Sequence, residues 1–337
     1  ITFERGKKVI YAELSKALYV TLQGSRLFWK RLTDFVTNDL GFEVNPYDWC
    51  VANKEINGSQ CTIAWYVDDL KISHKDSKVL DEILGRLNDE FGKEAPLTVT
   101  KGNVHDYLGM SIDFSNPGKV IFTMIDYIKN LIDETPEDLM KGFGTTPAAN
   151  HLFEVRDTAT PLDDEKTDTF HHLVAKLLYL SKRARPDIHL AVSFLCTRVQ
   201  NPDEDDLKKL GRCLRYLSST RDLHLTLRAD DLSSIRWWVD ASFAVHPDCK
   251  SHTGAAVTFG RGSAINMSSK QKINTRSSTE AELVGLNDAL TMVLWVRHFI
   301  EGQRFSVKDN IILQDNKSTI LMANNGKKSS GRHTRHI

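Results

Sequence analysis

Two adjacent aspartates, Asp68 and Asp69, interrupt an otherwise apolar stretch of the sequence, AWYVDDLKIS (residues 64–73). The flanking runs CTIAWYV and LKIS have the β-branched and aromatic composition that is typical of strands. Aspartate tolerates turn geometry and hydrogen-bonds its own backbone, so the pattern predicts a tight turn between two strands. Such a turn fixes two carboxylates that repel each other unless a cation lies between them. Two interpretations therefore stay open, a plain hairpin turn and a divalent-metal site.

Hydrophobic periodicity changes twice along the 337 residues and predicts three regions. Residues 1–125 mix short strand-like runs with helical stretches such as FWKRLTDFVTNDLGF, and residues 126–230 read as mostly helical. Residues 231–337 read as three strands, a long helix, a strand and a helix, which predicts a mixed sheet with helices packed on it. The expected fold class is α+β or α/β, with several domains.

Two apolar stripes mark the helices of the middle region. One stripe follows Pro186, which suits a helix start, and the other contains four leucines. The stripes are Ile188, Ala191, Val192, Leu195, Cys196 and Val199, then Leu207, Leu210, Leu214 and Leu217.

Composition excludes some classes of protein. Lysine plus arginine equals aspartate plus glutamate at 44 each, so only local basic stretches, at residues 1–31 and 327–335, suggest phosphate contacts. Five cysteines without a CxxC pair argue against a disulfide framework and for a reducing compartment. No apolar run approaches the roughly 18 residues of a membrane span, and no signal peptide is visible. We expect a soluble, intracellular chain without membrane contact that is part of a longer protein.

YVDDL resembles the YxDD turn of reverse transcriptases. Other segments resemble, in the same order, the Pol polyprotein of copia-type LTR retrotransposons of the Pseudoviridae. These segments are KALYVTLQGSRLFWKRL before the turn, DYLGMSI after it, and LLYLSKRARPDIHLAVSFL with LRYLSSTRDLHL farther on. The resemblance implies an N-terminally truncated palm over residues 1–125, a thumb or connection over 126–230 and an RNase H-like domain over 231–337.

The resemblance also implies roles for residues. Asp68 and Asp69 match two of the three palm carboxylates that bind catalytic Mg²⁺, with Mn²⁺ as an alternative and two ions per active site. The third aspartate is expected upstream, so polymerisation by these 337 residues alone is expected to be absent or very weak. The positions that match the nucleotide and template site are Gln23, Gly24 and Arg26, and Tyr66 matches the residue beneath the primer end.

Three acids in the last region lie at element ends: Asp240 after IRWWV, Glu282 in SSTEAELVGL and Asp315 after NIILQ. Each has an ordinary interpretation, since strand ends often carry aspartate and Thr279 with Glu282 has the spacing of a capping box. Glu280 competes with Glu282 as the functional acid on this helix.

Taken together, these acids and the strand order resemble the RNase H domain that follows copia-type reverse transcriptases. The resemblance implies that Asp240, Glu282 and Asp315 bind two metal ions and cut the RNA strand of an RNA–DNA hybrid. We prefer Glu282 to Glu280 because the family glutamate directly precedes the hydrophobic residue that starts the buried stripe, here Leu283. In the fold that this resemblance implies, a fourth carboxylate follows a stretch like HTRHI, with which the printed sequence ends.

The implied partners are an RNA template, a DNA primer, RNA–DNA hybrids and dNTPs. A homo-oligomer or association with the integrase of the same polyprotein is a further expectation, as is a cytoplasmic, virus-like-particle or nuclear location. Two alternatives stay open: a catalytically inactive nucleic-acid-binding scaffold and a decayed retroelement fragment.

Overall fold

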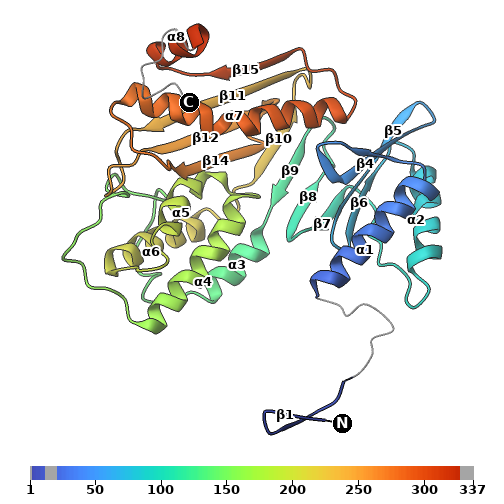
Figure 1. The fold of residues 1–337 in the computed structure, drawn as a ribbon, viewed down its shortest axis with the longest axis horizontal. Helices are drawn as coiled ribbons and strands as arrows, with labels where there is room; N and C mark the ends of the chain where they lie inside the picture. Colours follow the sequence, from blue (N-terminus) through green and yellow to red (C-terminus); the bar gives the residue numbers. More distant parts are fainter. Residues whose placement is uncertain (1, 12–20, 327–337) are drawn as a thin grey trace. The chain divides into compact units, whose positions relative to one another are not determined.

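The computed structural model describes residues 2–11 and 21–326. The chain forms two compact units, Ile1–Val99 and Thr100–Ile337, each with its own sheets and helices (Figure 1). The described residues form four β-sheets and eight α-helices. The expected mixed α/β class is therefore confirmed, whereas the division at residues 125/126 and 230/231 stays a prediction.

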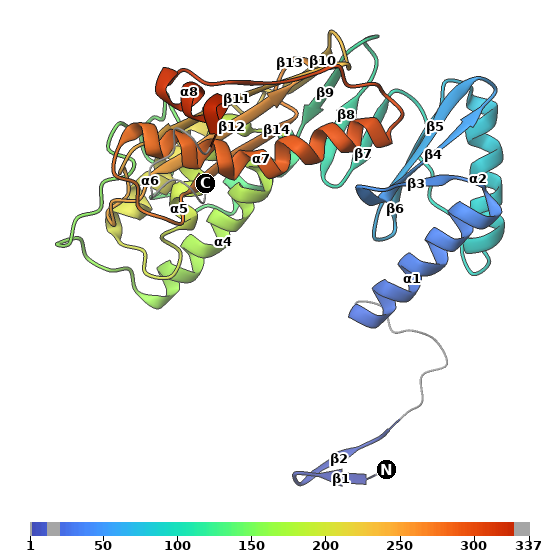
Figure 2. The same cartoon turned by 45° about the horizontal axis from the view of Figure 1, so that its top comes forward.

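The first unit contains an antiparallel four-stranded sheet of order β3-β4-β5-β6 and two helices (Figure 2). Alternate residues of one strand, Cys61, Ile63 and Trp65, are buried, as the period of two requires. They belong to one hydrophobic cluster with Leu32 and Ile83 from the two helices. The elements are β1 (Thr2–Glu4), β2 (Lys7–Val9), α1 (Leu22–Asp34), β3 (Glu43–Asn45), β4 (Asp48–Ile56), β5 (Ser59–Tyr66), β6 (Asp69–Ser73) and α2 (Ser77–Phe91).

The helix predicted from FWKRLTDFVTNDLGF changes form along its length. α1 ends at Asp34, and a π-helical turn continues over Phe35–Asp39. Leu40 caps this turn, and Gly41 follows with φ +70°, a conformation that glycine adopts at little cost.

The second unit contains two sheets, of order β13-β10-β9-β8-β7 and β14-β12-β11-β15. In the four-stranded sheet, β11 runs antiparallel to β12 and parallel to β15. β9 and β10 pair although about a hundred residues separate them, from Phe122 to Leu225. The strands are β7 (Val104–Tyr107), β8 (Met110–Asp113), β9 (Val120–Thr123), β10 (Leu225–Ala229), β11 (Ser234–Ser242), β12 (His252–Thr258), β13 (Gly260–Arg261), β14 (Ile265–Lys270) and β15 (Asp309–Leu313).

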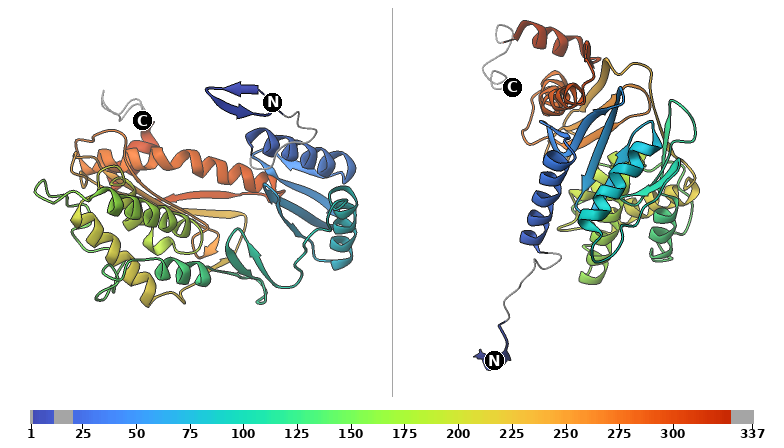
Figure 3. Two further views of the ribbon diagram at one scale, coloured as in Figure 1. Left: turned by 90° about the horizontal axis from the view of Figure 1, so that it is seen from below. Right: turned by 90° about the vertical axis from the view of Figure 1, so that its right-hand side faces the viewer.

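Four helices of this unit share one hydrophobic core, and a long helix, α7, runs along the four-stranded sheet and packs on β11 and β12 (Figure 3). Both predicted stripes enter the shared core, but the first helix ends at Cys196, so Val199 lies beyond it. The helices are α3 (Ile125–Asp133), α4 (Asp164–Ser181), α5 (His189–Cys196) after a 3₁₀ turn Pro186–Ile188, α6 (Glu204–Ser219), α7 (Ser278–Gly302) and α8 (Lys317–Asn325).

α7 corrects one expectation from the sequence. By length and composition alone, it is a helix that could cross a membrane, although its charged residues interrupt the apolar run. Core helices of folded domains pass the same test, and Ala289, Val293 and Val296 of α7 are buried in one hydrophobic cluster with Trp237 of β11. Packing on the sheet thus accounts for these buried residues, whereas Leu290 and Leu294 of the same helix are exposed.

Candidate active site

Asp68 and Asp69 lie at the predicted hairpin turn. Tyr66 pairs with Asp69 across the two strands, so Val67 and Asp68 form a two-residue connection. Both aspartates are exposed. Val67 has φ +57°, a left-handed conformation that is unfavourable for a β-branched residue and that glycine or asparagine usually occupies. The hairpin interpretation is confirmed, and it presents the two carboxylates to solvent.

The other residues matched to a nucleotide and template site come from different elements. Gln23, Gly24 and Arg26 lie in the first two turns of α1, where the Thr21 hydroxyl accepts a hydrogen bond from the Gly24 amide. Tyr66 ends β5 with 59% of its surface exposed and is thereby brought next to Asp69.

The predicted basic stretches are only partly described. Lys7 and Lys8 are exposed on β2, and Arg31 forms an ion pair with Glu90 of α2 at 2.6 Å. Residues 12–20 and the basic tail 327–335 lie outside the described residues.

Asp240, Glu282 and Asp315 converge although they come from three elements. In the parallel pair β11 and β15, Trp238 is opposite Leu313. Asp240 lies two residues after Trp238, and Asp315 lies two residues after Leu313. Glu282 lies in the first turns of α7, which packs on β11. One carboxylate oxygen from each residue lies within 4.8 Å of the other two. The sheet register and the helix position thus form one acidic cluster.

Helix capping explains why Glu282 is available for this cluster. The N-cap of α7 is Ser277, whose hydroxyl accepts a hydrogen bond from the Glu280 amide. The Glu280 carboxylate accepts one from the Arg276 amide at 2.6 Å. The Thr279–Glu282 capping box is therefore not formed. Glu280 serves the helix start, and Glu282, which is 6% exposed, faces the sheet.

Gln314 holds the Glu282 carboxylate in place, a contact that the sequence pattern did not predict. Its Nε2 donates to Glu282 Oε2 at 3.1 Å and to the Val239 carbonyl at 3.2 Å. Its Oε1 accepts from the Asn316 amide at 3.0 Å. The only sequence signal was its position directly before Asp315.

Burial and like-charge repulsion oppose simultaneous ionisation of the carboxyl groups in this cluster. Burial raises the pKa of Glu282, and the neighbouring Asp240 charge raises it further, whereas the Gln314 hydrogen bond opposes the shift. The Ala241 amide donates to Asp240 Oδ1 at 2.9 Å and fixes that carboxylate. A divalent cation would remove the like-charge repulsion, and carboxylate oxygens are the ligands that Mg²⁺ and Mn²⁺ prefer. The donor set therefore fits these ions.

Close packing keeps α7 near the sheet at this point. A Cβ atom added at Gly285 would lie 3.3 Å from the Ala241 Cβ and 3.5 Å from the Thr253 hydroxyl. Glycine allows this approach one turn from Glu282. Within the described ranges, Asp240, Glu282 and Asp315 are the residues that form a group of three or more metal-ligating side chains, and Asp68 and Asp69 belong to no such group.

Comparisons with known proteins find a family and several relatives that this chain resembles. Residues 3–146 match the family model described as "Reverse transcriptase (RNA-dependent DNA polymerase)". The chain is 26% identical over 339 residues to the Retrovirus-related Pol polyprotein from transposon TNT 1-94 of Nicotiana tabacum. This alignment covers 98% of the chain. It is 28% identical over 315 residues to the Pol polyprotein from transposon RE1 of Arabidopsis thaliana, which covers 93% of it. A transposon Ty5-1 protein of Saccharomyces cerevisiae is 27% identical over 273 residues, 80% of this chain. No solved structure shows significant similarity.

The chain spans 25% of the tobacco polyprotein and 21% of the Arabidopsis polyprotein, and 85% of the yeast protein. Its similarity to the two long proteins thus concerns one part of each. Residues 3–146 thus match a reverse transcriptase family model, and over most of its length the chain is similar to Pol polyproteins of copia-type retrotransposons.

Proposed function

We propose that the second unit is a ribonuclease H-type endonuclease that cuts the RNA strand of RNA–DNA hybrids. The convergence of Asp240, Glu282 and Asp315 within 4.8 Å carries this proposal. The order β14-β12-β11-β15, with β15 parallel to β11 after the long helix, supports the RNase H-like interpretation of residues 231–337. Hybrid recognition by backbone and shape would make the cleavage independent of sequence.

In this proposal Asp240, Glu282 and Asp315 would hold two Mg²⁺ or Mn²⁺ ions. The ions would supply an activated water and stabilise charge on the phosphodiester. The protein contributes a rigid set of oxygens: the Ala241 amide orients Asp240, and Gln314 orients Glu282. Burial and the Asp240 charge raise the pKa of Glu282, and a bound divalent cation would lower it again and favour the ionised carboxylate.

The first unit would supply part of a polymerase site that copies an RNA template into DNA from dNTPs. Asp68 and Asp69 would be metal ligands there. Asp68 lies in the two-residue connection and Asp69 begins β6, and the exposure of both supports access for a primer end. Gln23, Gly24, Arg26 and Tyr66 stay candidates for nucleotide and template contact. We also propose that this chain associates with other parts of a polyprotein.

The cleavage proposal is tested with the purified chain and an end-labelled RNA–DNA hybrid in magnesium and in manganese. Asp240→Asn and Glu282→Gln are expected to lower the cleavage rate by at least about a hundredfold, because each removes a charged metal ligand. Glu280→Gln is the matched control: it changes the same residue type two positions away, outside the acidic cluster, and should keep most of the activity.

Binding is read from the same samples by retardation of the labelled hybrid. Hybrid that is bound but not cut in either metal would overturn the endonuclease proposal and favour the nucleic-acid scaffold. Equal losses in Glu280→Gln and Glu282→Gln would show that helix stability, not the acidic cluster, sets the rate.

A further inference from the structure

A basic pocket of about 310 Å³ lies in the second unit, beside α6 and the loop that precedes α4. Five cationic side chains line it, against the two carboxylates of Glu154 and Asp205. The cations are Arg156, Lys208, Lys209, Arg212 and Arg215. The acidic cluster of Asp240, Glu282 and Asp315 contributes no residue to this pocket.

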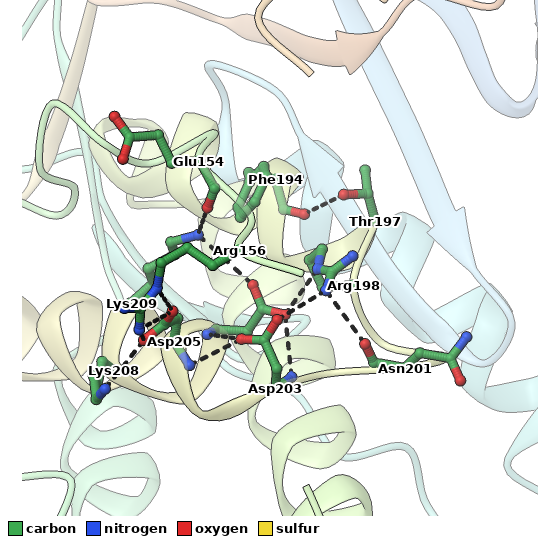
Figure 4. A network of polar contacts seen from close by, with 11 residues as sticks. Glu154, Arg156, Phe194, Thr197, Arg198, Asn201, Asp203, Asp205, Lys208 and Lys209 are labelled. Carbon is green, nitrogen blue, oxygen red and sulfur yellow. Dashed lines mark hydrogen bonds and ion pairs between the residues drawn. The ribbon is translucent and has the colours of Figure 1, made fainter. Parts of the chain in front are cut away.

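Local ion pairs account for three of the five cations (Figure 4). Asp205 accepts from two of the three Arg156 guanidinium nitrogens, Nε at 2.6 Å and Nη2 at 2.7 Å, and from Lys208 at 3.1 Å. Lys209, whose side chain is 10% exposed, lies 3.8 Å from the Asp206 carboxylate and donates to the Glu154 carbonyl at 2.5 Å. Asp206 itself is buried and already paired with Arg198 at 2.7 Å. These carboxylates are therefore shared among several cations.

Arg212 and Arg215 have no carboxylate partner among the described residues. Arg212 donates to the carbonyl and hydroxyl of Thr146, and Arg215 Nη1 donates to the Leu139 carbonyl at 2.6 Å. The Nε of Arg215 is buried and makes no hydrogen bond. Burial lowers the pKa of Arg215, and the neighbouring Arg212 charge lowers it further. Two guanidinium groups thus stand close together with uncompensated charge and a donor without an acceptor.

The pocket is built by close packing of a loop on α6. A Cβ atom on Gly144 would lie 2.7 Å from the Arg212 carbonyl and 2.7 Å from the Tyr216 amide. A Cβ atom on Gly211 would lie 2.9 Å from Arg215 Nη1. The absence of side chains at both glycines lets the loop carbonyls of Leu139 and Thr146 hold the two arginines. The arginines are therefore positioned by neutral acceptors, which leaves their charge for a ligand.

We propose that this pocket binds a phosphate group, presented either by a polynucleotide backbone or as free phosphate. Guanidinium groups bind phosphate oxygens through paired hydrogen bonds, and Lys208, Arg212 and Arg215 lie on one face of α6 at spacings of four and three. An anion here would neutralise the charge of the arginine pair. The site requires no cleavage chemistry.

The test compares Arg212→Gln with Arg221→Gln, which removes the same charge from an exposed side chain outside the pocket. Both are made in the Asp240→Asn protein, so that hybrid binding is measured without cutting. In the first arm, anisotropy of a labelled RNA–DNA hybrid is titrated at several salt concentrations. In the second arm, thermal unfolding is followed in sodium phosphate and in sodium chloride of equal ionic strength.

A backbone phosphate predicts that Arg212→Gln weakens hybrid binding about three- to tenfold and lowers the salt slope by about 0.9, with little change in Arg221→Gln. Free phosphate predicts that phosphate stabilises the parent and Arg221→Gln but not Arg212→Gln, at unchanged hybrid affinity. Lys208→Gln, whose side chain is 70% exposed, is the second variant and should act in the same direction without risk to folding.

Indistinguishable behaviour of the Arg212 and Arg221 variants in both arms would overturn the phosphate site. That outcome leaves the endonuclease proposal untouched, because cleavage is measured separately on the protein with an intact acidic cluster.

Discussion

Val67 carries the backbone strain of the hairpin that presents Asp68 and Asp69. Its φ of +57° costs a β-branched residue about 1–2 kcal/mol, whereas asparagine adopts this conformation more readily. We expect Val67→Asn to raise the free energy of unfolding of the first unit by about 1 kcal/mol, measured by urea denaturation.

The matched control is Val104→Asn on β7, because both valines are about half exposed and only Val67 has positive φ. Val104→Asn should lower stability, since asparagine is unfavourable in a strand. If both variants lower stability by the same amount, the turn at Val67 is not strained.

The acidic residues could be predicted from the sequence, but their exact surroundings could not. Element ends suggested Asp240, Glu282 and Asp315, and the structure brings their carboxylates together. The choice between Glu280 and Glu282 required the true N-cap, Ser277, which one sequence with several Ser and Thr candidates does not single out. Gln314 was missed because an amide that positions a carboxylate has no signature in the sequence.

Among the elements, α6 depends on the close approach of the loop at Gly144. Replacing Gly144 with alanine places a methyl group 2.7 Å from two backbone atoms of α6, so the loop or the helix must move. We expect Gly144→Ala to lower the free energy of unfolding of the second unit by about 1–3 kcal/mol, measured by thermal or chemical denaturation. Gly118→Ala is the control, because a Cβ atom at Gly118 would meet no atom within 4 Å. Its φ of +78° adds local strain to this variant.

A destabilisation confined to Gly118→Ala would contradict this account of α6. Displacement of the loop should also weaken phosphate binding in Gly144→Ala, because Thr146 and Leu139 hold the two arginines.

Periodicity predicted helices well where one face is buried and poorly where they end. Leu210, Leu214 and Leu217 are all fully buried on α6, as their spacing indicates. By contrast, the π-helical turn at Phe35–Asp39 adds a residue to the repeat, and α5 stops before Val199. Local packing decides these ends, and an apolar stripe does not report it.

At the scale of the whole molecule, strand partners were beyond what the sequence pattern could predict. A period of two identifies a strand but carries no information about its partner. The pairing of β9 with β10 and of β10 with β13 joins segments that the predicted boundaries at residues 125 and 230 separate. The mixed sheet of the last region could be expected because its order of strands and helix favours one layered solution.

A buried group of three histidines makes the second unit sensitive to acid. His246 Nε2 lies 3.0 Å from His252 Nδ1, and His252 Nε2 lies 2.8 Å from the Ser268 hydroxyl, while His189 Nδ1 is buried without a partner. Burial lowers the pKa of each of the three to about 4, from 6.5, and positive charges nearby oppose protonation further. These charges include Lys182 near His189, Lys250 and Lys270 near His246, and they outweigh Asp248.

Well above pH 6.5 these histidines are neutral in both the folded and the unfolded chain. Between pH 6.5 and 4 the unfolded chain binds protons that the folded unit excludes, so stability falls as the pH falls through this window. One unit of pKa corresponds to about 1.4 kcal/mol, so we expect a loss of at least about 2 kcal/mol by pH 4.5. The measurement is urea denaturation of the second unit across this pH range. His246→Gln should make the free energy of unfolding depend less on pH. His224→Gln, which changes an exposed histidine, should show the same pH dependence as the parent. The carboxylates are the same in all three proteins, so the comparison between them removes the carboxylate contribution. Parallel curves for the parent and His246→Gln would show that the histidine group does not carry the acid sensitivity.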